Sequence, residues 1–126
     1  VKLTLDPALA PVTVTRFVEL ARSGFFQKMR IHRVVPGFVV QLGDPGGDGY
    51  GGAGKEPLAC ETSPVTFAPG SVGVALAGRD TGSSQFFVTL ASFPHLDGDY
   101  ALIGRAEPGW ERLAQGDVVE KVRLAP

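Results

Sequence analysis

Hydrophobic and polar residues alternate along this chain at two spacings, one typical of β-strands and one typical of an α-helix. Val1–Leu5 has the two-residue period of a half-buried strand, and Asp6-Pro7 ends it. Between Pro11 and the stop signal Ser23-Gly24, apolar residues recur at helical spacing: Val14, Phe17, Val18 and Ala21. We therefore expect a strand followed by a helix whose apolar stripe covers a sheet.

The remaining apolar segments are short and are separated by glycine or proline. They are Ile31–Val35, Phe38–Leu42, Val72–Ala77, Gln85–Leu90, Tyr100–Ala106 and Val118–Ala125. This spacing predicts a small β-barrel or sandwich. A second, short helix is expected over Trp110–Ala114, before Gln115-Gly116-Asp117 turns the chain into its last strand.

Composition and charge narrow the classes of function. The 126 residues are 44% apolar, which suits one domain over residues 1–126 with its own core. The net charge is -1 with both signs mixed along the chain, which disfavours nucleic acid and membranes as partners. No apolar run approaches the roughly 20 residues of a membrane span, so we expect a soluble, cytoplasmic protein. Because the chain opens at Val1 without methionine, an exported form with a removed N-terminal segment stays open.

The strand pattern at residues 85–90 gives a first indication of a binding surface. Residues two apart on a strand share a face, so the strand has a core side, formed by Phe86, Val88 and Leu90. The other side of the strand, which we expect to be the outer face, contains Gln85, Phe87 and Thr89. An amide and a large aromatic ring therefore lie next to each other there. Val39 and Gln41 share a side in the same way. Such a surface suits a peptide, because apolar side chains hold a ring and amides hold a backbone. Taken one at a time, such residues are more often packing or solvated surface.

Several blocks of sequence resemble those of the cyclophilin family, in the same order and at similar spacing. They are Phe25-Phe26, IHRVVPGFVVQLGD at residues 31–44, GSSQFFV at residues 82–88 and Leu96-Asp97-Gly98. The resemblance covers nearly the whole chain, and its two long blocks are highly specific. It implies an all-β fold with two capping helices, a closed eight-stranded antiparallel barrel whose first strand is expected to be missing from this chain. It also implies a peptidyl-prolyl cis-trans isomerase, which accelerates rotation about X-Pro bonds and assists protein folding.

Carried over position by position, the resemblance makes Arg33 the catalytic guanidinium, accompanied by Phe38 and by Gln41, which is expected to contact the substrate carbonyl region. The other expected site residues bind the substrate: Val39, Ala75, Leu76, Gln85, Phe87, His95, Leu96 and Tyr100. The loop beside the neighbouring subsite is expected to contain Gly49, Gly51 and Gly52.

Four of these positions depart from the common family pattern. Val39 stands where methionine is usual, Leu76 where asparagine is common, His95 where tryptophan is usual and Tyr100 where histidine is usual. Tyrosine at the last position also occurs in bacterial members, where it can pack on the proline ring and offer a hydroxyl. The family tryptophan helps to hold the macrocycle cyclosporin, so His95 predicts weak cyclosporin binding.

The resemblance implies no cofactor and no metal ion, and it implies a monomer whose partners are proline-containing peptides and unfolded proteins. The rival function is a peptide-binding module that holds proline segments without turnover. Arg33 with Gln41 favours an enzyme, because binding a proline ring needs no charge aimed at the amide nitrogen.

Other chemistries find little support in the sequence. The glycine run of residues 46–54 leads into Lys55, but Glu56 follows where a phosphate-binding loop needs serine or threonine. The histidines and the single cysteine, Cys60, lack paired metal-ligand spacing, and we interpret His32 as a hydrogen-bonded structural residue. Ser83 and Ser84 lack the G-x-S-x-G elbow of a hydrolase.

Overall fold

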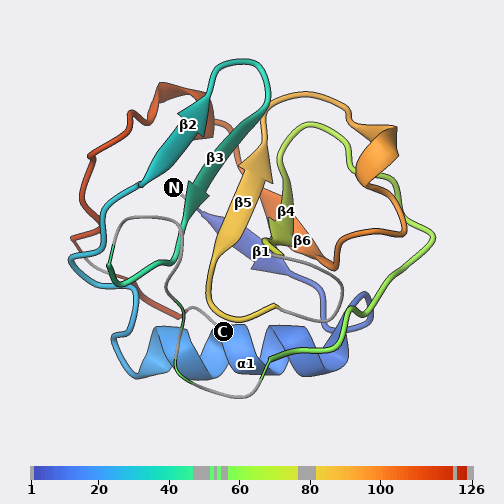
Figure 1. Ribbon diagram of the computed structural model, residues 1–126, viewed down its shortest axis with the longest axis horizontal. Coiled ribbons are helices and arrows are strands. Elements are labelled where there is room, and N and C mark those ends of the chain that lie inside the picture. Colours follow the sequence, from blue (N-terminus) through green and yellow to red (C-terminus); the bar gives the residue numbers. More distant parts are fainter. Residues whose placement is uncertain are drawn as a thin grey trace.

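The structure, a computed structural model, describes residues 2–46, 52, 54, 57–76, 82–120 and 122–124. Within these residues six strands form one sheet: β1 (Leu3–Leu5), β2 (Arg33–Val35), β3 (Val39–Leu42), β4 (Ser71–Val74), β5 (Phe86–Thr89) and β6 (Leu102–Ala106). The helix α1 (Pro11–Arg22) and two 3-10 turns, η1 (Pro94–Leu96) and η2 (Trp110–Arg112), accompany the sheet (Figure 1). None of the described helices is both long and apolar enough to cross a membrane.

The sheet is antiparallel throughout, and its strand order is β1-β6-β4-β5-β3-β2. At its centre, Gln41 of β3 lies opposite Phe87 of β5, and Gly73 of β4 lies opposite Phe87 from the other side. Because directly paired residues share a face, these three lie side by side on one face of the sheet. Val40 pairs with Val88 in the same register, so these two residues lie on the opposite face.

That opposite face packs against α1, which lies across the bottom of the view in Figure 1. Val40, Phe86 and Val88 share one buried cluster with Val14 and Leu20 of the helix. The expected core side of β5 and the expected helix are therefore confirmed.

The N-terminus of α1 is capped from a distant part of the chain. Ala10 at the N-cap position offers no side-chain acceptor. The Glu61 carboxylate instead accepts hydrogen bonds from the Val12 N–H at 3.2 Å, the Thr13 N–H at 2.6 Å and the Thr13 hydroxyl at 2.7 Å. Burial acts to raise the pKa of Glu61, but these hydrogen bonds outweigh it and lower the pKa below its ordinary value. The segment that precedes β4 is thus tied to the helix.

The closed eight-stranded barrel is not found among the described residues, where the sheet is open with β1 and β2 at its edges. The expected last strand, Val118–Ala125, contributes only a bridge between Val118 and Arg30, and residues 121 and 125 lie outside the described residues. Lys28, two residues before Arg30, has a φ of +62°, a conformation that interrupts a regular strand ladder.

The expected second helix over Trp110–Ala114 is a single 3-10 turn, η2, so the described chain has one α-helix rather than two. Extended backbone at Leu113 ends this turn after three residues. The Glu111 carboxylate accepts the Gly109 N–H at 3.0 Å, a local bond that competes with helix propagation.

Candidate active site

The hairpin of β2 and β3 places a guanidinium beside an amide. Pro36-Gly37 forms its turn, in which the Phe38 N–H donates to the Val35 carbonyl at 2.9 Å. Gly37 has φ of +72°, as the second central residue of a type II turn requires. This turn sets the register that puts Arg33 opposite Gln41, and Arg33 Nη1 donates a hydrogen bond to Gln41 Oε1 at 3.1 Å.

A second amide extends this polar chain to the start of β5. Gln41 Nε2 donates to Gln85 Oε1 at 3.0 Å. The two strands meet closely here, because the buried Ser84 hydroxyl donates to the Gly43 carbonyl at 2.6 Å. Gly43 has φ of +101°, and a side chain on it would collide with the Ser84 backbone. The hydrogen-bonded side chains of Arg33, Gln41 and Gln85 are therefore positioned by the turn between β2 and β3 and by the close contact of Gly43 with Ser84.

A pocket of about 250 Å³ opens beside this polar chain. Its lining consists of Arg33, Phe38, Val39, Gln41, Ala75, Leu76, Phe87, Leu96 and Tyr100. Phe87 and Leu96 are almost fully buried, and Tyr100 meets Phe87 edge to face with ring centroids 5.6 Å apart. Among the described lining residues, Arg33 alone carries a charge. The site thus combines a pocket lined mainly by apolar side chains with an exposed guanidinium among its described lining residues.

The pocket brings together nine of the eleven residues that the sequence predicted for the site. Gln85 adjoins the pocket through its hydrogen bond to Gln41. His95 does not line the pocket; it is exposed and stacks on Phe38, with ring centroids 6.4 Å apart and an interplanar angle of 25°. Gly49 and Gly51 lie outside the described residues. The roles assigned to all these side chains stay predictions.

The face that was expected to be outward is covered. Phe87 is only 5% exposed and Thr89 only 1%, because Phe67 and Leu96, which lie outside the strands, cover this side of the sheet. Phe67 and Phe93 were both missed by the sequence analysis. Each lies in an irregular segment, so no strand or helical periodicity pointed to them. The available signal was a nearby proline, since Phe67 lies between Pro64 and Pro69 and Phe93 precedes Pro94.

No group of three or more metal-ligating side chains occurs among the residues that the structure describes. Cys60 Sγ donates to the Asp99 carbonyl at 3.6 Å. Neither ring nitrogen of His32 has a hydrogen-bond partner, so the interpretation of His32 as a hydrogen-bonded residue is wrong. The glycine run of residues 46–54 falls mostly outside the described residues.

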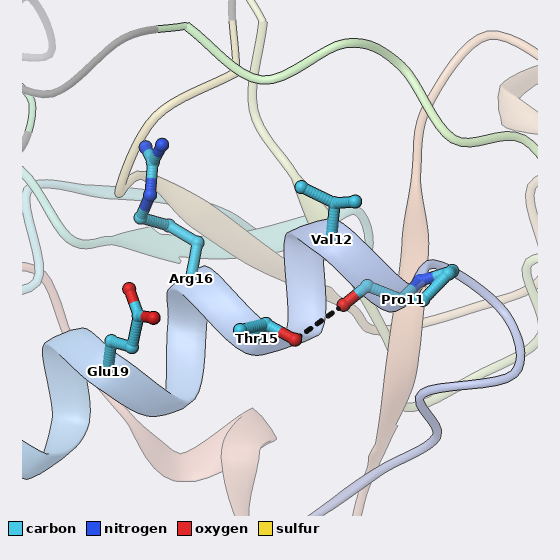
Figure 2. A pocket seen from close by; sticks show the side chains of 5 residues that line it. All are labelled: Pro11, Val12, Thr15, Arg16 and Glu19. Carbon is cyan, nitrogen blue, oxygen red and sulfur yellow. Dashed lines mark hydrogen bonds between the residues drawn. The ribbon is translucent and has the colours of Figure 1, made fainter.

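A larger hollow of about 360 Å³ lies on the outer surface of α1 (Figure 2). The described residues that line it all belong to α1: Pro11, Val12, Thr15, Arg16 and Glu19. The Thr15 hydroxyl donates back to the Pro11 carbonyl at 2.8 Å, and Val12 is 63% exposed. Among the residues that the structure describes, α1 alone lines this hollow, and no second described element contributes a side chain to it.

Comparison with known proteins identifies relatives over most of the chain. Residues 1–123 match the family model described as cyclophilin type peptidyl-prolyl cis-trans isomerase/CLD. The chain is 42% identical over 129 residues to peptidyl-prolyl cis-trans isomerase B of Bacillus subtilis, a match that covers 98% of this chain and 90% of the relative. It is 40% identical over 124 residues to a peptidyl-prolyl cis-trans isomerase of Helicobacter pylori, covering 93% and 76% of the two chains.

Solved structures give the same result. The crystal structure of a Cryptosporidium parvum cyclophilin type peptidyl-prolyl cis-trans isomerase matches with a TM-score of 0.85 and 25% identity, over 98% of this chain and 91% of the other. A crystal structure of that isomerase in the presence of the dipeptide Ala-Pro matches with a TM-score of 0.80 and 31% identity. This second match covers 86% of this chain and 73% of the other.

Proposed function

Because this chain belongs to the cyclophilin-type peptidyl-prolyl cis-trans isomerase family, we propose that its pocket binds the proline ring of X-Pro segments and that Arg33 accelerates rotation about the preceding peptide bond. The observation that carries this proposal is the position of Arg33, the one cation among the described residues of a pocket lined mainly by apolar side chains. The dipeptide Ala-Pro with which the Cryptosporidium isomerase was crystallised is an X-Pro unit, which supports this class of substrate.

The reaction needs few polar groups, because no covalent bond breaks. An amide rotates only by losing its resonance, at a barrier of about 18–20 kcal/mol. In the twisted transition state the prolyl nitrogen is no longer conjugated and recovers a lone pair. A donor directed at that nitrogen therefore stabilises the transition state more than the planar ground state.

Arg33 has the properties of that donor. Its guanidinium stays charged and offers five N–H groups, so it can bond Gln41 Oε1 and still donate to the substrate. The hydrogen bond from Gln41 to Gln85 fixes which atom of the Gln41 amide faces Arg33. One preorganised donor of this kind typically contributes about 3 to 4 kcal/mol to catalysis.

The apolar walls supply the second contribution. Phe38, Phe87 and Leu96 can hold the proline ring while the acyl side of the bond rotates. They also exclude water, which solvates the planar amide dipole better than the twisted one. We expect proline-containing peptides and unfolded proteins as substrates, and a monomer, which sedimentation equilibrium would test.

The test is the cis-to-trans exchange rate of an Ala-Pro-Phe peptide, measured by NMR with wild type, Arg33→Ala and Arg33→Lys. Arg33 is exposed, so both variants should fold normally. We expect Arg33→Ala to lose about 10²- to 10³-fold in rate. Arg33→Lys should recover little, because an ammonium cannot present the same planar fork of donors. If wild type bound the peptide without accelerating exchange, the pocket would be a recognition module and the isomerase proposal would be wrong.

Inhibition by cyclosporin tests the effect of having histidine at position 95, where the family usually has tryptophan. An imidazole that stacks on Phe38 outside the pocket offers less surface than the indole usual in the family, so we expect weak inhibition. His95→Trp should then lower the inhibitory concentration about 10-fold, the effect of roughly 1.4 kcal/mol of added contact. Equal inhibition of both proteins would remove His95 as the cause.

The finer description of the fold also stays a proposal. The match to the Cryptosporidium structure over 98% of this chain supports a closed eight-stranded barrel. Beyond the edge strand β2, the Ile31 N–H donates to the Asp117 carbonyl and the Val119 N–H to the Met29 carbonyl, each at 2.8 Å, a pairing that closure would continue. NMR contacts between the backbone of these segments and that of β1 would support closure, and solvent-exchanging amides along β1 would exclude it.

A further inference from the structure

Two aromatic side chains lie directly behind the aromatic walls of the pocket. Phe67 stacks on Phe87, with ring centroids 5.9 Å apart and an interplanar angle of 22°. Phe93 meets Phe38 edge to face at 4.8 Å and 82°. Phe67 and Phe93 do not belong to the pocket lining, and Phe67 is only 1% exposed. Each wall ring is therefore backed by a supporting ring.

One series of hydrogen bonds joins the two supporting rings to a third wall residue. Asp97 Oδ1 accepts the Phe67 N–H at 2.8 Å. The Phe67 carbonyl accepts the Phe93 N–H at 2.9 Å, and the Phe93 carbonyl accepts the Leu96 N–H at 3.0 Å. Leu96 lines the pocket and Asp97 follows it in sequence. The Asp97 carboxylate thus holds the segment of Phe67 against the turn η1.

Gly73 leaves the space that this arrangement needs. A Cβ atom on Gly73 would lie 2.5 Å from Phe87 Cζ and 2.8 Å from Phe67 Cε2. The stacked rings therefore lie directly over the backbone of β4. Neither ring can approach the sheet further, so the position of Phe67 over Phe87 depends on the bonds that hold its segment. Asp97 accepts the Phe67 N–H, and Thr89 and Ser71 bond the neighbouring Ala68.

We propose that Asp97 is a positioning residue of the isomerase, which sets the separation of Phe38 and Phe87 through Phe93 and Phe67. The inference rests on the proposed function for its catalytic consequence. The hydrogen bonds of Asp97 are separate from those that join Arg33, Gln41 and Gln85. A displaced wall weakens the hold on the ring in the ground state and in the transition state alike, so it raises KM and leaves kcat nearly unchanged.

The experiment compares Asp97→Ala with Asp97→Asn, by KM and kcat for Ala-Pro-Phe peptide exchange and by the Kd of the same peptide. Alanine removes the acceptor of the Phe67 N–H, and we expect KM and Kd to rise about 10-fold with kcat within about 2-fold. Asparagine keeps an oxygen in the same place and should bring KM back to within about 3-fold of wild type. An unchanged KM in Asp97→Ala, or a loss confined to kcat, would overturn the proposal.

A matched pair of ring substitutions separates positioning from general destabilisation. Phe93→Leu removes a ring behind the pocket, whereas Phe17→Leu removes a half-buried ring that contacts Phe26 and Phe86 on the α1 face. We expect KM to rise in Phe93→Leu only, although both variants lose thermal stability. A similar rise in Phe17→Leu would show that the effect is general. Because Kd is measured separately, the positioning role can be judged even if wild type proves to bind without turnover.

Discussion

Both faces of the sheet are covered by aromatic clusters, but the two covers are built differently. On one face α1 lays a continuous apolar stripe over the strands, and Phe17, Phe26 and Phe86 pack with centroids 5.0 to 5.6 Å apart. On the other face no helix is present among the described residues, and the cover consists of η1 and the irregular segment that contains Phe67. The helix α1 thus fills the space above its face of the sheet, whereas η1 and the irregular segment leave room for the pocket on the other face.

The two covers are also held by different forces. The helix lays apolar side chains on the sheet, whereas the segment that carries Phe67 combines the burial of that ring with hydrogen bonds to polar groups of β4 and β5 beneath it. The buried Thr89 hydroxyl donates to the Ala68 carbonyl at 2.8 Å, and the Ser71 Oγ accepts the Ala68 N–H at 3.0 Å. Directional bonds specify the position of a cover without needing a large apolar area. This allows the pocket to stay open.

The largest expected effect is a loss of stability on the helix face. Phe86→Ala removes a ring that is 4% exposed and contacts both Phe17 and Phe26, and it should lower the free energy of unfolding by about 3–5 kcal/mol. The KM of the folded fraction should not change, because Phe86 points away from the pocket. Urea unfolding and peptide exchange, corrected for the fraction folded, check both statements. A raised KM would show that the two faces are coupled.

A smaller effect on stability, with a larger effect on binding, is expected from Gly73→Ala. The added methyl group would crowd Phe87 and Phe67, and overpacking of this kind costs about 1–3 kcal/mol. Phe87 should relieve the crowding by moving into the pocket, so we expect KM to rise about 10-fold. Isothermal peptide binding and urea unfolding measure the two quantities. If stability fell but Kd did not change, the crowding would be relieved by a movement other than that of Phe87 into the pocket.

The sequence predicted the residues that line the pocket because they lie in contiguous motifs whose spacing is fixed by strands. Arg33, Gln41 and Phe87 are brought together by the register of β2, β3 and β5 alone. Strand alternation correctly sorted which residues share a face. It could not show that Phe87 is covered, because coverage depends on what lies above the strand and periodicity describes only the strand itself.

What the sequence could not predict is held by contacts between irregular segments. Phe67 is positioned by a carboxylate 30 residues away, and Thr13 by one 48 residues away. Such bonds leave no periodic pattern, so neither the supporting rings nor the distant helix cap could be identified beforehand. The second helix failed for a related reason, because the local bond from Gly109 to Glu111 competes with propagation over so short a segment.

The smallest expected effect concerns Glu61, which joins the two covers because it caps α1 and precedes Phe67 on the same segment. Its pKa is lower in the folded protein than in the unfolded chain, so the ionised carboxylate stabilises the fold above the unfolded pKa of about 4.3. That contribution is lost as the pH falls through the folded pKa. Glu61→Gln should therefore be less stable than wild type by about 1 kcal/mol at pH 7, the usual worth of a helix cap.

The difference between Glu61→Gln and wild type should shrink as the pH is lowered below about 4, because protonated Glu61 resembles glutamine. Urea midpoints at pH 7 and pH 3.5 measure it, with Glu107→Gln as a control for the loss of one exposed negative charge. A difference that is equal at both pH values would mean that the charge of Glu61 does not hold the helix. If KM rose as well, the segment from Glu61 to Phe67 would transmit strain from the helix cover to the pocket, and the two faces would not be independent.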